Sequence, residues 1–96
     1  MIKLYIVIID QASLDNILID RIRVCSDDNY RFWENHWLIA SESSAQAIYD
    51  ILTADGYSNV SIYVQEINVI QGSFWGRMNK NLWGWLKNHI SNDNQN

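Results

Sequence analysis

The sequence predicts an α+β domain of the ferredoxin-like βαββαβ type, an antiparallel sheet with two helices on one face, followed by a short C-terminal helix. Short runs of β-branched and aromatic residues alternate along the chain with amphipathic segments. Their order is strand, helix, strand, strand, helix, strand, which is the split βαβ pattern. A chain of 96 residues builds one hydrophobic core, so we expect one domain over 1–90 and a disordered polar tail over 91–96.

The first predicted strand runs from Leu4 to Ile9 and ends at Asp10. It contains no polar residue, whereas a strand with one face in water alternates apolar and polar side chains. Both of its faces should therefore be buried, although the two helices of this fold cover only one face. We predict that the same face of a second copy covers the other one in a closed symmetric dimer. The C-terminal helix is the alternative cover.

The first helix is predicted in the segment SLDNILIDRIRVC, with Ser13 as its N-cap and Asp15 at the positive end of the helix dipole. The turn-forming residues 27–29 should end it. Apolar side chains recur at helical spacing and form one buried stripe, which consists of Leu14, Ile17, Leu18, Ile22 and Cys25. On this stripe Cys25 should be a packing residue and not a reactive thiol.

Two strands are predicted next, about Tyr30–Trp33 and His36–Ala40, because the aromatic-rich segment YRFWENHWLIAS is interrupted by Glu34 and Asn35. One long bent strand is the alternative. The second helix should begin at Ser43, since Gln46 three residues later completes a capping box. Its predicted buried stripe is Ile48, Ile51 and Leu52, and Gly56 is placed to end it in the left-handed conformation.

The last strand is predicted in NVSIYVQEINVI, where apolar residues alternate up to Val64 and then shift by one position at Ile67. A shift of one residue moves side chains to the opposite face, so we expect a bulge or a strand break near Gln65 and Glu66. The segment NKNLWGWLKNHI predicts a terminal helix that faces the body with Leu82, Trp85, Leu86 and Ile90. Gly84 costs such a helix about 1 kcal/mol, which a close approach to a neighbouring backbone would explain.

The charge and the cysteine content limit the classes of function that the sequence allows. The net charge is −4, which argues against a broad nucleic-acid surface. Residues 1–66 hold ten acidic and four basic residues, whereas residues 67–92 hold three basic residues and no acidic one. This asymmetry indicates either a solvated helix face or a basic patch that meets an acidic partner. A single cysteine excludes an internal disulfide, and the first 20 residues contain no signal-peptide core, so we expect a cytoplasmic protein.

The loop QGSFWGRM is the best candidate for a partner-binding surface. Trp75 lies beside Phe74 and Arg77, and Trp and Arg dominate binding energetics at interfaces. Lys80 follows in the adjacent helix. The acidic balance of the chain favours a protein partner over nucleic acid at these residues.

Four segments in this order and spacing, LYIVIID, NHWLIAS, SAQAIYDIL and LWGWLKNH, resemble the SinR-like small proteins. These proteins are related to the CRISPR-associated adaptation endonuclease family, numbered two in that nomenclature, and more distantly to VapD-type toxins. In the broader group, the first strand ends in an aspartate, and two copies pair so that both aspartates hold a divalent metal for phosphodiester cleavage. Asp10 is the matching position, and Trp37 and the segment 83–86 match the aromatic positions.

The resulting hypothesis is a homodimeric binding or regulatory protein of a bacterial or mobile-element defence system, without catalysis and without a resident cofactor. Two alternatives remain open. The first is a Mg²⁺- or Mn²⁺-dependent endonuclease in which Asp10 is both the catalytic residue and the metal ligand. The second is an acidic phage inhibitor of a defence nuclease, with residues 1–66 as a nucleic-acid mimic. From the residues alone, a turn or capping role for Asp10 is favoured over a role as a metal ligand.

Overall fold

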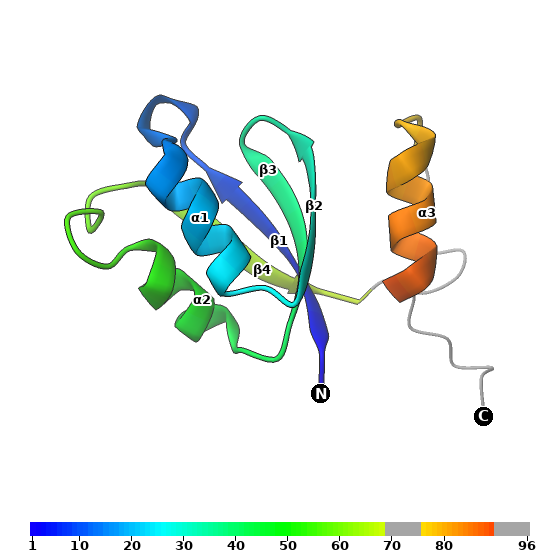
Figure 1. Ribbon diagram of the computed structural model, residues 1–96, viewed down its shortest axis with the longest axis horizontal. Coiled ribbons are helices and arrows are strands. Elements are labelled where there is room, and N and C mark those ends of the chain that lie inside the picture. The colour runs from blue at the N-terminus through cyan, green and yellow to red at the C-terminus, as the bar shows by residue number, and fades with distance from the viewer. Residues whose placement is uncertain (69–75, 90–96) are drawn as a thin grey trace.

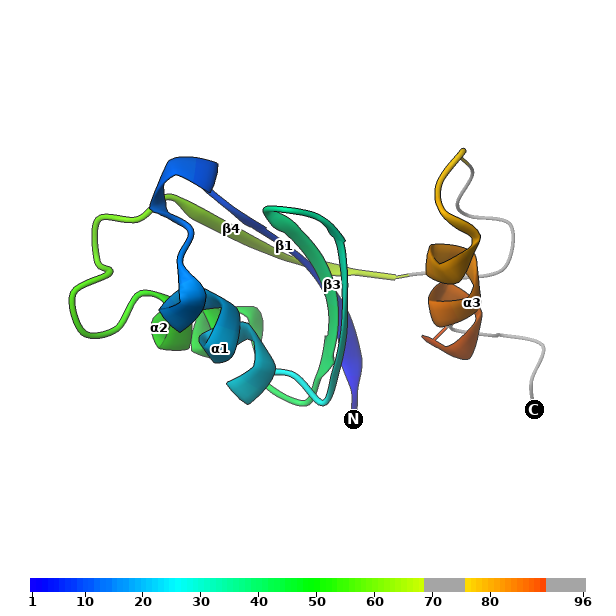
Figure 2. The same cartoon turned by 45° about the horizontal axis from the view of Figure 1, so that its top comes forward.

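The computed structural model describes residues 1–68 and 76–89 (Figure 1). The four strands form one antiparallel sheet of order β2-β3-β1-β4. The helices α1 and α2 lie side by side over one face of this sheet, and α3 lies at the far end of the molecule, beyond β2 (Figures 1 and 2). The elements in chain order are β1 (Lys3–Ile9), the 3-10 helix η1 (Gln11–Ser13), α1 (Asn16–Val24), β2 (Asp28–Trp33), β3 (His36–Ser41), α2 (Ala45–Leu52), β4 (Ile62–Ile67) and α3 (Lys80–His89).

The predicted α+β class is confirmed, and so is the division of the aromatic segment into two strands, β2 and β3. The architecture is compatible with the ferredoxin-like prediction and includes the predicted C-terminal helix as α3, whereas η1 was not predicted. Ile90 and the predicted tail 91–96 lie outside the described residues. Among the described helices, none combines the length and the hydrophobicity that crossing a bilayer requires.

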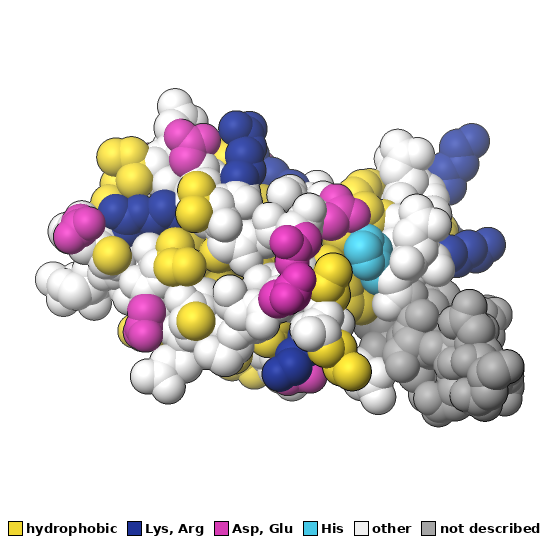
Figure 3. All heavy atoms as spheres, turned by 60° about the horizontal axis from the view of Figure 1, so that its bottom comes forward, with side chains coloured by type: hydrophobic (Ala, Val, Ile, Leu, Met, Phe, Trp, Pro, Cys, Tyr) yellow, Lys and Arg dark blue, Asp and Glu magenta, His cyan; other side chains and the backbone are white. Residues whose placement is uncertain are grey.

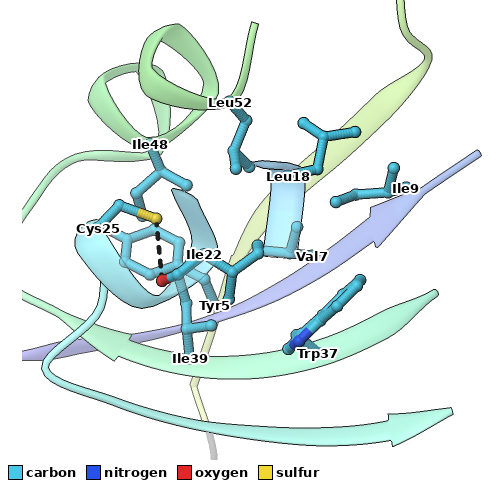
Figure 4. Close-up of a cluster of buried hydrophobic side chains, with 10 residues drawn as sticks. All are labelled: Tyr5, Val7, Ile9, Leu18, Ile22, Cys25, Trp37, Ile39, Ile48 and Leu52. Atoms are coloured by element: carbon cyan, nitrogen blue, oxygen red, sulfur yellow. Dashed lines mark hydrogen bonds between the residues drawn. The ribbon is translucent and has the colours of Figure 1, made fainter. Parts of the chain in front are cut away.

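The main hydrophobic core lies between the sheet and the two helices α1 and α2 (Figure 4). Its members are Tyr5, Val7 and Ile9 of β1, Trp37 and Ile39 of β3, and Leu18, Ile22, Cys25, Ile48 and Leu52 of the helical layer. The alternate residues of β1 point into it because side chains alternate between the two faces of a strand. Burial raises the pKa of Cys25 to about 11, so its thiol stays protonated and the predicted packing role is confirmed.

The N-terminus of α1 differs from the prediction. Asp15 is the N-cap, and its Oδ1 accepts a hydrogen bond of 2.9 Å from the backbone N–H of Leu18. Ser13 lies one turn earlier, in η1, where its hydroxyl donates to Asp10. The extra turn makes α1 start later than predicted, and Ile17 is more than half exposed as a result. Hydrogen bonds from the Tyr57 hydroxyl and the Leu18 N–H lower the pKa of Asp15.

Helix α2 is capped by Ser44 and not by Ser43. The Ser44 hydroxyl accepts a hydrogen bond from the N–H of Ala47, whereas the carbonyl of Ser43 accepts one from the Tyr5 hydroxyl at 2.6 Å. The predicted buried stripe of this helix is confirmed. Gly56 has the left-handed backbone, with φ of 92°, but it lies beyond the C-cap Thr53 and shapes the loop instead of ending the helix.

The predicted bulge or strand break near Gln65 and Glu66 is wrong, because β4 pairs with β1 in unbroken register from Ile62 to Ile67. Ile62 and Val64 pack against the main core, and Ile67 packs on the opposite face of the sheet. The shift in the apolar pattern therefore reflects a change in which face of β4 is covered, from the side of α1 and α2 at Ile62 and Val64 to the side of α3 at Ile67. The irregular register occurs in β2, between Arg31 and Trp33.

Gly84 lies in an exposed position inside α3, and a Cβ added there would meet nothing within 4 Å. No close backbone approach explains this glycine, contrary to the interpretation above. We expect Gly84→Ala to raise the free energy of unfolding of α3 by about 0.5–1 kcal/mol, because glycine loses more backbone entropy in a helix. Urea unfolding and hydrogen exchange of the α3 amides measure this. Gly56→Ala is the opposite control, because alanine is strained at the positive φ of this position, and it should lower the free energy of unfolding. An unchanged free energy of unfolding in Gly84→Ala would contradict the prediction.

Candidate functional site

The sheet face opposite α1 and α2 carries three rows of side chains. Residues directly opposite each other in an antiparallel sheet share a face, so the register defines each row. Across the sheet from β2 to β4, the first row is Asp28, Ala40, Leu4 and Ile67, the second is Tyr30, Leu38, Ile6 and Gln65, and the third is Trp33, His36, Ile8 and Tyr63. We keep these names for the rows below.

Helix α3 covers part of the first two rows. Leu82 and Leu86 are buried in a second hydrophobic cluster with Leu4, Leu38 and Ala40. This contact explains why β1 is apolar on both faces at its N-terminal end. Over these rows the cover is the chain's own terminal helix, the alternative considered in the sequence analysis. The predicted second copy would therefore cover the third row, which α3 leaves open.

Polar and aromatic contacts at the C-terminal end of α3 hold it against β2. His89 Nε2 and Asp28 Oδ2 are 2.9 Å apart, and the His89 ring lies 4.2 Å from the ring of Trp85 between centroids. The indole Nε1 of Trp85 is buried near Asp28, outside normal hydrogen-bond geometry. Partial burial alone would raise the pKa of Asp28, but hydrogen bonding to His89 and the nearby N–H groups lower it.

The third row remains open. Trp33 is 57% exposed and Tyr63 is 53% exposed, and both flank the partly buried Ile8 and His36. The His36 ring meets the Trp33 ring edge-on at 5.2 Å, and His36 Nδ1 lies 2.9 Å from Asn35 Oδ1. The amide of Asn35 also donates to the carbonyl of Ile9 at 3.0 Å, which fixes the β2–β3 turn to the end of β1.

Asp10 lies exposed just beyond this row, at the rim of a hollow of about 430 Å³ whose lining includes Ile8, Asn35 and Tyr63. Its backbone N–H donates to the Ser61 carbonyl at 2.9 Å, and its carbonyl accepts from the Ser13 N–H at 3.0 Å. Its carboxylate accepts a hydrogen bond of 3.3 Å from the Ser13 hydroxyl. These bonds are those of a turn residue between β1 and η1.

Metal binding within one copy is not supported by the described residues. Over 1–68 and 76–89, no group of three or more Asp, Glu, His or Cys side chains is arranged to hold a metal ion. Asp28 lies opposite Ala40, at the other end of the sheet from Asp10, so the acidic pair 27–28 does not join it. A site at Asp10 would need ligands from a second copy or from a substrate.

The predicted partner-binding residues are only partly described. Phe74 and Trp75 lie outside the described residues. Arg77 and Lys80 are exposed, and Arg77 borders a second hollow of about 370 Å³ between β2 and α3. We call it the β2–α3 pocket; its lining residues are Tyr30, Phe32, Trp33, Arg77, Met78, Asn79 and Leu82.

Two groupings of residues could not be found by sequence reasoning. The third row is made by strand register, and its only local sign was the unbroken apolar run of β1. The contact between Asp28 and His89 joins residues 61 positions apart and has no local signature.

No protein-family model, curated protein or solved structure matches this chain. The resemblance described from the residues therefore remains a hypothesis, and function must be argued from the surfaces above.

Proposed function

We propose that this chain is a non-catalytic binding protein of ferredoxin-like fold that pairs with a second copy through the third row. The observation that carries this proposal is the exposure of Trp33 and Tyr63 on the part of the sheet face that α3 leaves open. Tyr and Trp are enriched at protein interfaces, where their large rings are removed from water. Pairing two such rows would cover the remaining open part of this face in both copies.

The ferredoxin-like assignment is supported by the βαββαβ order of β1 to β4 and by the position of α1 and α2 over one face. In a closed symmetric dimer, both subunits contribute the same patch. The third row of one copy would therefore pack against the third row of the other. The setting in a bacterial or mobile-element defence system rests on the resemblance to the SinR-like proteins alone.

The dimer is tested by replacing Tyr63 with aspartate and measuring the mass in solution by light scattering. We expect the wild-type chain to have twice its monomer mass of 11.3 kDa. Tyr63→Asp should weaken the dimer by about tenfold to a hundredfold, because loss of a central aromatic contact costs about 2 kcal/mol or more. Tyr49→Asp is the matched control, since Tyr49 is 42% exposed but belongs to α2. A monomeric wild type would refute this contact.

A metal-dependent nuclease is the second candidate. It is favoured by the exposed carboxylate of Asp10 beside the third row, because a dimer formed there would carry both aspartates next to its interface. Cleavage of RNA or DNA would then require Mg²⁺ or Mn²⁺ and would be lost in Asp10→Ala and reduced in Tyr63→Asp. Equal activity in the wild type and in Asp10→Ala would exclude this candidate.

A further inference from the structure

We propose that the β2–α3 pocket binds an extended acidic peptide of a partner protein, with one apolar side chain in the pocket and a carboxylate on Arg77. This inference deepens the proposed binding function and rests on it, but it uses a different end of the molecule from Tyr63. Trp33 borders both the pocket and the third row, so the tests below use residues that belong to only one of them.

The pocket has the size and lining of an anchor site for one side chain. Its volume is about 370 Å³, near the lower end of the range for ligand sites. Three aromatic rings of β2 line it on one side, from Tyr30, Phe32 and Trp33, and Met78 and Leu82 line it on the other. Methionine adapts to side chains of different shape, and aromatic rings supply most of the contact energy of such anchors.

The backbone beside the pocket belongs to an edge strand, against which α3 packs at its C-terminal end. β2 is an edge of the sheet, and within the described part of the chain only β3 pairs with it. An unpaired edge offers N–H and C=O groups to an added extended segment. Alternate side chains of such a segment point to the same face, so one of them would reach the pocket.

The charges around the pocket select an acidic segment. Arg77 is exposed and forms no hydrogen bond or ion pair with any residue of the described ranges. The pocket lining contains no carboxylate, and Asp28, two residues before Tyr30 on β2, is held by His89. Two groups of basic side-chain atoms project at the α3 end in the view of Figure 3, where no acidic side chain lies beside them. A carboxylate of the partner would therefore form an ion pair with the Arg77 guanidinium.

A peptide fits these observations better than a nucleic acid. Binding a phosphate backbone requires several clustered cations, and only Arg77 among the lining residues is charged. One apolar anchor followed by one or two carboxylates matches both the lining and the charge.

A displayed library of random eight-residue peptides tests the proposal, with the folded full chain as bait. We expect the wild type to enrich peptides that carry an aromatic or large aliphatic residue within two positions of Asp or Glu. Arg77→Glu should reverse the preference toward Lys or Arg, and the most enriched acidic peptide should bind this variant at least tenfold more weakly. Lys87→Glu, an equal charge change elsewhere on α3, should leave the enrichment unchanged.

Three results would overturn the proposal. These are no enrichment with the wild type, the same enriched peptides with Arg77→Glu, or binding of a twelve-residue oligouridine that Arg77→Glu abolishes. Tyr63→Asp is selected in parallel, because it removes the proposed dimer contact and leaves the pocket intact. Peptide binding by a monomeric protein would refute the dimer alone, and a dimer without peptide binding would refute the pocket alone.

Discussion

Replacing Trp37 with alanine will lower the free energy of unfolding by about 3–5 kcal/mol, the usual cost of removing a large buried aromatic side chain. Trp37 is 2% exposed and is the largest of the fully buried side chains of the main core. It lies on β3 between β1 and β2, and the Arg31 guanidinium covers its ring at 5.1 Å. The neighbouring side chains cannot fill the volume that its indole leaves. Urea unfolding monitored by circular dichroism measures the loss.

Trp33→Ala is the matched control in the same hairpin. Its side chain is 57% exposed, so we expect a change of less than about 1 kcal/mol. An equal loss of stability in the two variants would contradict the prediction that burial in the main core sets the size of the effect.

Leu86→Asp will release α3 from the sheet while the main core stays folded. Leu86 and Leu82 are the buried residues of α3. The substitution removes the stabilisation from burying the Leu86 side chain, about 1.5–3 kcal/mol. It also places a carboxylate in the apolar cluster with Leu38 and Ala40. The helix shares no buried residue with the main core, so the two clusters should separate. Hydrogen exchange should become fast for the amides of α3 and remain slow for those of β1 and β3.

Lys87→Asp is the control for this experiment, because the neighbouring Lys87 is exposed and its replacement should leave the exchange of α3 unchanged. Global unfolding of Leu86→Asp would contradict the separation of the two clusters. Unchanged exchange would show that α3 is held by contacts other than its leucines.

The docking of α3 also depends on pH through Asp28. Because the folded-state pKa of Asp28 is below the ordinary aspartate value of 3.8, its contribution is fully present above that value and is lost as the pH falls through the folded-state pKa. The effect should be small, since the carboxylate is 52% exposed and water screens its contact with His89. Asp28→Asn should remove this acid dependence, which hydrogen exchange of α3 between pH 5 and pH 3 would measure.

The position of α3 changes how the open sheet face is understood. The unbroken apolar run of β1 predicted a cover on both faces, which α3 supplies at the N-terminal end of the strand, but the run does not say which molecule supplies the cover or how far it extends. Leu4 is covered by α3, whereas Ile8, four residues further along the same strand face, lies in the open third row. One position is leucine and the other is isoleucine, so their hydrophobicity does not show which of the two α3 covers.

The candidate site was predictable only in part. Asp10 was found because a carboxylate directly follows a buried strand, and the structure places it exposed beside the third row. Its turn contacts with Ser13 and Ser61 could not be deduced, because they depend on how η1 and the β4 start fold back. Arg77 was selected for its neighbours in sequence, but its position beside the β2 aromatics follows from the docking of α3.

The sequence by itself determined the kinds and the order of the elements, because hydrophobic periodicity and turn residues act over a few neighbouring positions. Local patterns failed where two neighbours were chemically equivalent, as with Ser43 and Ser44, or where a phase shift had two explanations, as at Ile67. Only the tertiary structure decided which rows of the sheet α3 buries and which it leaves in water. That choice depends on contacts between residues far apart in the chain, such as Asp28 with His89, and their free energy exists only once the chain has folded.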